Sequence, residues 1–239
     1  MNKQSNVYTI IYASVMVIIV GVVLAFTYGA LKPFQDENIE ADKQQQILAA
    51  ARIVPEGKAA DAFAKYITNS FAVNAEGQVV SENAKDVFGI NMAQEMKKAE
   101  EERQYPVFEF TGDDGAKRYI LAVSGAGLWG AIWGYVAVEE DGHTIYGAYF
   151  SHAGETPGLG AEIAKPDFQN QFQGKDLVKE GEFKPVQVMK KGQVPTDGSD
   201  YVDAISGGTI TSKGVQDMLS ACLSGYKGFL INVNNQPSK

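Results

Sequence analysis

The N-terminal part of the sequence contains a long run without a charged side chain, and this run restricts the possible folds more than any other feature. No Asp, Glu, Lys or Arg occurs between Lys3 and Lys32, and residues 8–28 read YTIIYASVMVIIVGVVLAFTY. A helix of about 20 apolar residues spans the ~30 Å hydrocarbon core of a bilayer. The sequence therefore predicts a transmembrane helix over residues 8–31, preceded by a short N-terminus, 1–7.

A cleaved signal peptide is the alternative interpretation of this run. Its apolar region is typically ~7–15 residues long and is followed by a cleavage site of small residues. The present run is longer, and the segment TYGALKPF after it offers only a poor site. The pattern favours an uncleaved anchor in contact with membrane lipid.

The orientation of the anchor is predicted from the few charges that flank it. Lys3 and the terminal amine precede the span, whereas Lys32 after it is soon followed by Asp36 and Glu37. Positively charged flanks tend to stay in the cytoplasm. We therefore expect the short N-terminus inside the cell and the large C-terminal part outside.

Charge and cysteine content exclude several classes of function. The chain has 29 acidic against 21 basic residues and a formal net charge of −8, whereas a nucleic-acid binder needs a basic face. A single cysteine, Cys222, and two histidines provide neither a disulfide framework nor the ligands of a zinc or iron–sulfur site. No metal site is predicted, and redox chemistry would require an organic cofactor.

The remainder of the chain predicts an α+β domain with an antiparallel sheet and flanking helices. Strand patterns cluster in YPVFEF, RYILAVSG, GLWGAIWGYVAVE and TIYGAYFSH, and two Asp-Gly pairs, at 114–115 and 141–142, mark hairpin turns. A further strand is expected at FKPVQVMK. Strands and helices do not alternate strictly, which favours antiparallel pairing. We assign 32–100 to a membrane-proximal segment and 101–239 to the main domain.

Helical patterns are expected in six places. The segment after the anchor, residues 36–53, has apolar residues at helical spacing. A second helix is expected over AADAFAKYITNSF, and NMAQEMKKAEEERQ is expected to form a charged helix or a linker. Short helical patches follow at GLGAEI and DFQNQF, and a final helix runs from about Ser212 to Tyr226.

The segment DAISGGTITSKGV, residues 203–215, places hydroxyl groups around two glycines just before the final helix. Thr211 or Ser212 is expected to cap that helix, and Thr209 then projects beside its N-terminus. Unpaired amide N–H groups and the helix dipole favour an anion there, and a phosphate is the natural occupant. An ordinary capped helix start is the competing interpretation.

Familiar nucleotide and hydrolase motifs do not fit the sequence. A P-loop requires Gly directly before Lys-Ser/Thr, and GLGAEI has Ile163 where a dinucleotide fingerprint has its third glycine. Ser206, His152 and Asp203 supply the residue types of a catalytic triad, but ISGG is not the G-x-S-x-G elbow. No catalytic residue is assigned.

Three segments in order resemble the FMN-binding domain family. DAISGGT resembles the flavinylation motif, SHAGETPGLGAEI the Glu/Asp-Thr-Pro-Gly-Leu-Gly loop, and GLWGAIWGYVAV the Leu-Trp-Gly strand of these domains. With the N-terminal anchor, the order and spacing resemble the C subunits of sodium-translocating NADH:quinone oxidoreductases, and the G subunits of Rnf complexes share the architecture. Gly208 departs from the pattern, because the family usually has alanine there.

The resemblance implies a function and a cofactor. Thr209 would carry FMN as a phosphoester, attached by a separate flavin transferase that moves FMN from FAD, so that no resident base is needed. The chain would be an inner-membrane flavoprotein subunit that relays electrons from NADH towards ubiquinone in a multisubunit, sodium-exporting translocase. Asp203 would position or recognise the motif, and Ser206, Gly207, Gly208, Thr211 and Ser212 would lie around the phosphate, with capping as the open alternative for the hydroxyls.

The other two motifs are expected to contribute the surroundings of the flavin ring. In ETPGLG, the backbone at Gly158 and Gly160 could approach a flat ring and Leu159 could pack on its face, with Glu155 or Thr156 as a helix cap in the alternative interpretation. Trp129 and Trp133 are spaced for one strand face, where core packing is favoured over flavin stacking. Trp129, together with Glu155 and Thr156, is nevertheless included among the candidate cofactor-binding residues. A structural role is favoured for His152 over a bond to flavin.

Two further functions stay open from the sequence. One is the Rnf homologue, which exchanges electrons between ferredoxin and NAD. The other is a non-redox, membrane-tethered binding or assembly module. A covalently retained flavin would exclude the non-redox module. The electron donor of the complex would distinguish the Rnf homologue from a subunit of the sodium-translocating reductase.

Overall fold

The structure is a computed structural model that describes residues 6–234, and the N-terminal Lys3 and C-terminal Lys239 lie outside this range. The chain divides into two compact units, residues 1–43 and 44–239. This division differs from the predicted boundary at 100. The reason is that residues 67–73 pair with the strand at 105–111, and that Phe71, Ala72 and Val73 lie in the hydrophobic core of the main domain.

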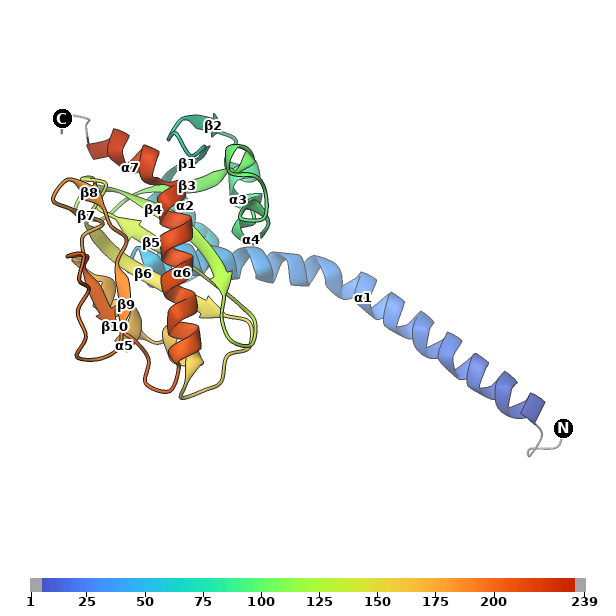
Figure 1. Cartoon of the computed structure of the whole chain (residues 1–239). Coiled ribbons are helices and arrows are strands. Elements are labelled where there is room, and N and C mark those ends of the chain that lie inside the picture. Colours follow the sequence, from blue (N-terminus) through green and yellow to red (C-terminus); the bar gives the residue numbers. More distant parts are fainter. Residues whose placement is uncertain (1–5, 235–239) are drawn as a thin grey trace. The chain divides into compact units, whose positions relative to one another are not determined.

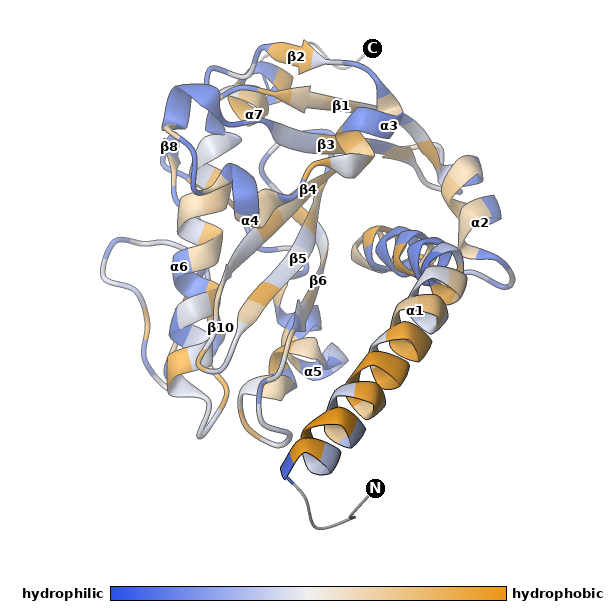
Figure 2. Cartoon of the chain, turned by 90° about the vertical axis from the view of Figure 1, so that its right-hand side faces the viewer, coloured by the Kyte–Doolittle hydropathy of each residue, from blue (hydrophilic) through white to orange (hydrophobic). Residues whose placement is uncertain are grey.

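The first unit is formed by most of one long helix, α1 (Asn6–Ala50). Within α1 an apolar stretch is long enough to cross a membrane, by length and composition, and its side chains are exposed. Figure 2 shows this apolar stretch in orange, followed by a hydrophilic stretch in the same helix. From Gln44 onward the helix belongs to the second unit, where Ile47, Leu48 and Ala50 are buried.

The second unit is built on a six-stranded antiparallel sheet of order β2-β1-β3-β4-β5-β6 (Figure 1). Its strands are β1 (Ile67–Val73), β2 (Val79–Ser81), β3 (Tyr105–Thr111), β4 (Lys117–Ala126), β5 (Ala131–Val138) and β6 (Ile145–His152). Both predicted Asp-Gly hairpins are confirmed, between β3 and β4 and between β5 and β6. Gly115 and Gly142 adopt φ of 75° and 73°, which glycine reaches without steric cost.

The longest helix of this unit is α6 (Thr209–Gly225), which packs against β4. Val215, Met218, Leu219 and Cys222 are buried along one stripe, as their helical spacing predicts. A side-chain methyl at Gly125 of β4 would lie 2.8 Å from Cβ of Met218, so glycine allows this close approach of helix and sheet. The packing holds the N-terminal turn of α6 near the β4–β5 turn.

Shorter elements complete the unit. They are α2 (Ala59–Tyr66), α3 (Ala84–Gly89), α4 (Met92–Glu95), α5 (Pro166–Gln169), α7 (Lys227–Asn234), the 3₁₀ turns η1 (Glu100–Glu102), η2 (Gly160–Ala164) and η3 (Asn170–Phe172), and the strand pairs β7 (Val178–Lys179) with β8 (Glu182–Phe183) and β9 (Gln187–Met189) with β10 (Tyr201–Asp203).

The structure corrects two predicted helices. The helix expected over AADAFAKYITNSF ends at Tyr66, and residues from Ile67 onward form β1, because they pair with β3 and bury Phe71 in the core. The final helix begins at Thr209 rather than near Ser212. In both cases tertiary contacts decide where the helix ends or begins.

Candidate functional site

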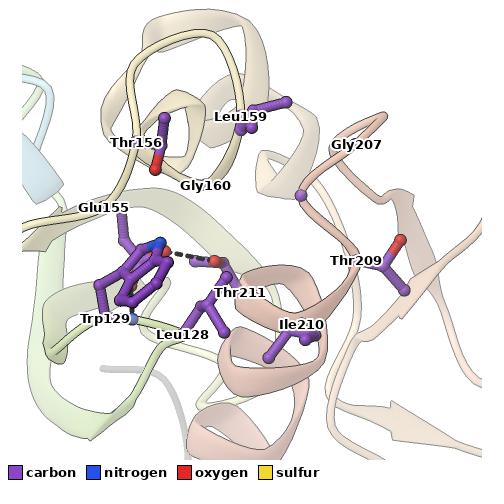
Figure 3. A pocket seen from close by; sticks show the side chains of 11 residues that line it. Leu128, Trp129, Glu155, Thr156, Leu159, Gly160, Gly207, Thr209, Ile210 and Thr211 are labelled. Atoms are coloured by element: carbon purple, nitrogen blue, oxygen red, sulfur yellow. Dashed lines mark hydrogen bonds between the residues drawn. The ribbon is translucent and has the colours of Figure 1, made fainter.

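A cavity of about 370 Å³ lies where three segments of the second unit meet (Figure 3). These segments are the turn between β4 and β5, the loop that follows β6, and the turn that leads into α6. The lining residues are Leu128, Trp129, Glu155, Thr156, Leu159, Gly160, Gly207, Gly208, Thr209, Ile210 and Thr211. The three segments that the sequence singled out are thus brought together by the fold.

The turn before α6 leaves the helix N-terminus without a side-chain cap. Gly208 is the N-cap residue, and no side chain accepts a hydrogen bond there. The first intrahelical donor is the N–H of Ser212, which donates to the carbonyl of Gly208 at 2.8 Å. The N–H groups of Thr209, Ile210 and Thr211 therefore have no partner within the helix.

The predicted caps have other roles. The prediction that Thr211 or Ser212 caps the helix is wrong, because both lie inside its first turn and are buried. The hydroxyl of Ser212 instead accepts a hydrogen bond from the backbone N–H of Ile205 at 3.0 Å. This bond connects the start of the turn to the first turn of α6. Gly207 supports the turn with φ of 76°.

Thr209 is the first residue of α6, and its side chain is exposed. Figure 3 shows it on one side of the cavity, with Trp129 on the other. Its hydroxyl is therefore accessible for modification. Thr211 is only 1 % exposed and donates its hydroxyl hydrogen bond to Oε2 of Glu155 at 2.5 Å.

Glu155 is the buried charged group of the cavity, at 5 % exposure. In addition to Thr211, the backbone N–H of Trp129 donates to its Oε1 at 2.8 Å. Burial by itself raises the pKa of Glu155, but the hydrogen bonds from Thr211 and Trp129 outweigh it, so the pKa lies below its ordinary value. The alternative interpretation, in which Glu155 or Thr156 caps a helix, is wrong, since η2 begins at Gly160 without a side-chain cap.

Four apolar side chains at the cavity are exposed to solvent: Leu128, Trp129, Leu159 and Ile210. Trp129 is 70 % exposed and belongs to the β4–β5 turn, so the prediction that it packs in the core is wrong. Trp133 lies on β5, where it is half-buried and donates its indole N–H to Oε1 of Gln46 at 2.9 Å. Exposed apolar groups around one cavity indicate a binding surface.

The loop after β6 is held in place by hydrogen bonds that its backbone N–H groups donate. Gly158 adopts φ of 76° and its N–H donates to Oε1 of Glu162 at 3.0 Å, while the N–H of Leu159 donates to the carbonyl of Thr156 at 3.1 Å. A methyl group at Gly207 would lie 2.7 Å from Cδ2 of Leu159, so the loop and the turn before α6 are in close contact.

Four predicted site residues lie outside the cavity lining, Asp203, Ser206, Ser212 and Gly158, and so does His152, for which a structural role was favoured. Asp203 ends β10, and its backbone N–H donates to Oε1 of Gln171 at 2.8 Å. Ser206 is exposed in the turn. His152 ends β6, and its Nδ1 accepts the backbone N–H of Glu155 at 3.1 Å, in agreement with the favoured structural role.

Sequence reasoning missed two lining residues, Leu128 and Ile210. Leu128 stands directly before Trp129 in the Leu-Trp-Gly motif, so that motif was a sufficient signal. Ile210 precedes the predicted start of the final helix. An exposed isoleucine in the first turn of a helix becomes visible as a site residue only when the helix boundary is known.

Comparison with known proteins identifies the family. The C subunit of the Na⁺-translocating NADH-quinone reductase of Neisseria meningitidis serogroup B is 34 % identical, and the match covers 99 % of this chain and 96 % of that protein. The chain belongs to the family of these C subunits. The corresponding protein of Vibrio vulnificus is 33 % identical, with 91 % of each chain covered.

Solved structures of this family have the same fold. The C subunit from Parabacteroides distasonis is 49 % identical with a TM-score of 0.77, over 84 % of this chain and 96 % of that one. NqrC of Shewanella oneidensis is 28 % identical with a TM-score of 0.68, over 82 % and 98 %. The predicted α+β fold, with an apolar N-terminal helix and an antiparallel-sheet domain, is thereby confirmed.

The sequence model of the FMN-binding domain matches residues 127–224. This range includes all the residues that line the cavity. The residues present also fit FMN chemically. An uncapped helix N-terminus suits a phosphate, and the exposed apolar side chains suit the faces of a flat aromatic ring. This C subunit therefore has an FMN-binding domain within a complex that transfers electrons.

Proposed function

We propose that Thr209 carries FMN as a phosphoester, and that the chain relays electrons through this group within a Na⁺-translocating NADH-quinone reductase. Membership of the family of C subunits supports the assembly, and the FMN-binding domain supports the cofactor. The single observation that carries the attachment site is the exposed hydroxyl of Thr209 at the uncapped start of α6. When bound, a flavin supplies one- and two-electron redox chemistry.

The helix N-terminus explains why a phosphoester would be stable at Thr209. A diester retains a negative charge, and the N–H groups of the first turn together with the helix dipole favour an anion there. The β-branched threonine side chain has few χ1 rotamers, so the ester would point in a restricted direction. Among the described residues that line the cavity there is no Lys or Arg. The negative charge of the phosphodiester would therefore be stabilised by the backbone N–H groups of the first turn of α6.

The surroundings of Thr209 support attachment by a separate enzyme. Histidine does not occur among the lining residues of the described chain, and both oxygens of Glu155 already accept hydrogen bonds. A flavin transferase would bring the activating base. In that reaction Oγ1 of Thr209 attacks the FMN phosphorus of FAD, AMP leaves, and the hydroxyl proton passes to the transferase.

The anchor and orientation belong to the same proposal. The apolar stretch of α1 suits a single membrane span in contact with lipid, and the flanking charges favour a cytoplasmic N-terminus with the FMN domain in the periplasm. The other subunits of the reductase would be the electron partners. A single span without intramembrane charge offers no ion path, so sodium would cross elsewhere in the complex.

The intact mass of the full-length chain tests the attachment. Chain produced with a flavin transferase should exceed the polypeptide mass by one FMN less one water, and should stay fluorescent after denaturation. Chain produced without the transferase is the control and should show the bare mass. A bare mass in both preparations, with active transferase and FAD present, would refute the covalent proposal.

A further inference from the structure

The carboxylate of Glu155 connects two parts of the cavity that lie far apart in the sequence. One oxygen accepts the backbone N–H of Trp129 in the β4–β5 turn, and the other accepts the hydroxyl of Thr211 in the first turn of α6. Figure 3 shows the second bond as a dashed line between Glu155 and Thr211. The backbone N–H of Glu155 bonds in turn to His152, which fixes the loop to the end of β6.

Two glycines leave the space that this carboxylate occupies. A methyl group on Gly127 would lie 2.5 Å from Oε1 of Glu155. A methyl group on Gly160 would overlap both Oε2 of Glu155 and the hydroxyl of Thr211. The surrounding backbone is thus shaped around the hydrogen-bonded pair, and no larger residue fits at either position without a shift.

The contacts leave Glu155 poorly suited to bind a cofactor directly. Its side chain is almost fully buried, and each of its oxygens accepts a strong hydrogen bond from protein. The Thr211 hydroxyl likewise donates its only proton to Glu155. Neither group has a free donor for a phosphate, although both lie at the cavity wall.

We infer that Glu155 is a positioning residue and Thr211 its partner: together they fix the Trp129 turn relative to the first turn of α6, and so set the shape of the flavin pocket. This inference rests on the proposed function, because it assigns the cavity to the flavin. It changes the expected role of Thr211 from a phosphate ligand to a structural donor. Charge-assisted hydrogen bonds are about twice as strong as neutral ones, which suits this task.

A double-mutant cycle tests the pair in the full-length chain. Glu155→Gln, Thr211→Val and the double variant are compared for the initial rate of FMN attachment by flavin transferase with FAD. We expect each single variant to lose roughly tenfold, the value of one hydrogen bond to a charged group. The double variant should also lose roughly tenfold rather than a hundredfold, because both changes break the same contact.

A conservative variant and a spectral readout separate positioning from general loss of stability. Thr211→Ser keeps the hydroxyl and should restore attachment to near the wild-type rate. In the loaded single variants, which circular dichroism must show to be folded, the visible flavin spectrum should shift. Normal attachment and an unchanged spectrum in folded Glu155→Gln, or additive losses in the double variant, would overturn the inference.

The flavin-free chain allows a test of the inference that does not depend on the proposed function. In a Trp133→Phe background, Trp129 is the only tryptophan, so its fluorescence reports on the β4–β5 turn alone. Glu155→Gln should lower the fluorescence anisotropy of Trp129, and Thr211→Val should do the same, because the turn that carries this exposed side chain becomes more mobile. Unchanged anisotropy in both variants would overturn the inference, whereas absence of FMN from Thr209 in the wild type would overturn only the proposed function.

Discussion

Thr209 and Thr211 are two residues apart, yet the structure gives their hydroxyls opposite environments. The Thr209 side chain is exposed at the helix start, and the Thr211 side chain is buried against Glu155. Thr209→Ala should therefore abolish covalent flavin while the unfolding temperature stays within about 2 °C of wild type, because exposed substitutions change stability little. In-gel flavin fluorescence and a thermal melt measure the two effects. Normal fluorescence in this variant would move the tether to another hydroxyl.

Glu155 should make the stability of the domain depend on acidic pH. Its pKa is lowered in the folded protein from an ordinary value of 4.5, so its ionised form is favoured by folding. The contribution is fully present above the ordinary value and is lost as the pH falls through the folded-state pKa. The stability difference between wild type and Glu155→Gln should shrink below about pH 4.5. Urea midpoints at pH 7 and at lower pH check this, and a constant difference would contradict it.

At the scale of elements, the loop of residues 155–160 is expected to shape the environment of the flavin. Leu159 is 42 % exposed at the cavity, whereas Gly158 at φ of 76° cannot be changed without backbone strain. In Leu159→Asp, FMN should still attach to the untouched Thr209, but the added negative charge should lower its reduction potential. About 1.4 kcal/mol corresponds to ~60 mV for a one-electron couple.

A matched control for this variant is Val194→Asp. Val194 is also an exposed aliphatic residue, but it does not line the cavity. Spectroelectrochemical titration should give the wild-type potential for Val194→Asp and a lower one for Leu159→Asp. Equal potentials in all three proteins would restrict the loop to a structural role.

At the scale of the whole molecule, the prediction concerns topology. α7 packs Phe229, Leu230 and Val233 into the core, so a reporter fused after Lys239 should leave the domain intact. Alkaline phosphatase fused there should be active, and green fluorescent protein at the same position should be dark, because the domain is expected in the periplasm. Fluorescent cells with inactive phosphatase would reverse the orientation.

The features that the sequence predicted correctly depend on residues close together in the chain. An apolar run, an Asp-Gly turn and an amphipathic stripe are local patterns, and so α1, the hairpins of the sheet and the body of α6 were predicted correctly. The motifs around Trp129, Glu155 and Thr209 were likewise found from short segments. Local patterns suffice where the chain itself supplies the hydrogen-bond partners or the turn.

The tertiary structure alone decided which groups of those motifs meet. The sequence offered no reason for Glu155 to accept hydrogen bonds from Trp129 and Thr211, for Trp129 to be exposed, or for residues after Tyr66 to leave a helix for a strand. Each outcome depends on packing between segments that are distant in the chain. Burial and hydrogen bonding between distant segments are properties of that packing. Helical or strand periodicity is a property of the local sequence, and for this reason the periodicity could be predicted whereas the burial and the hydrogen bonds could not.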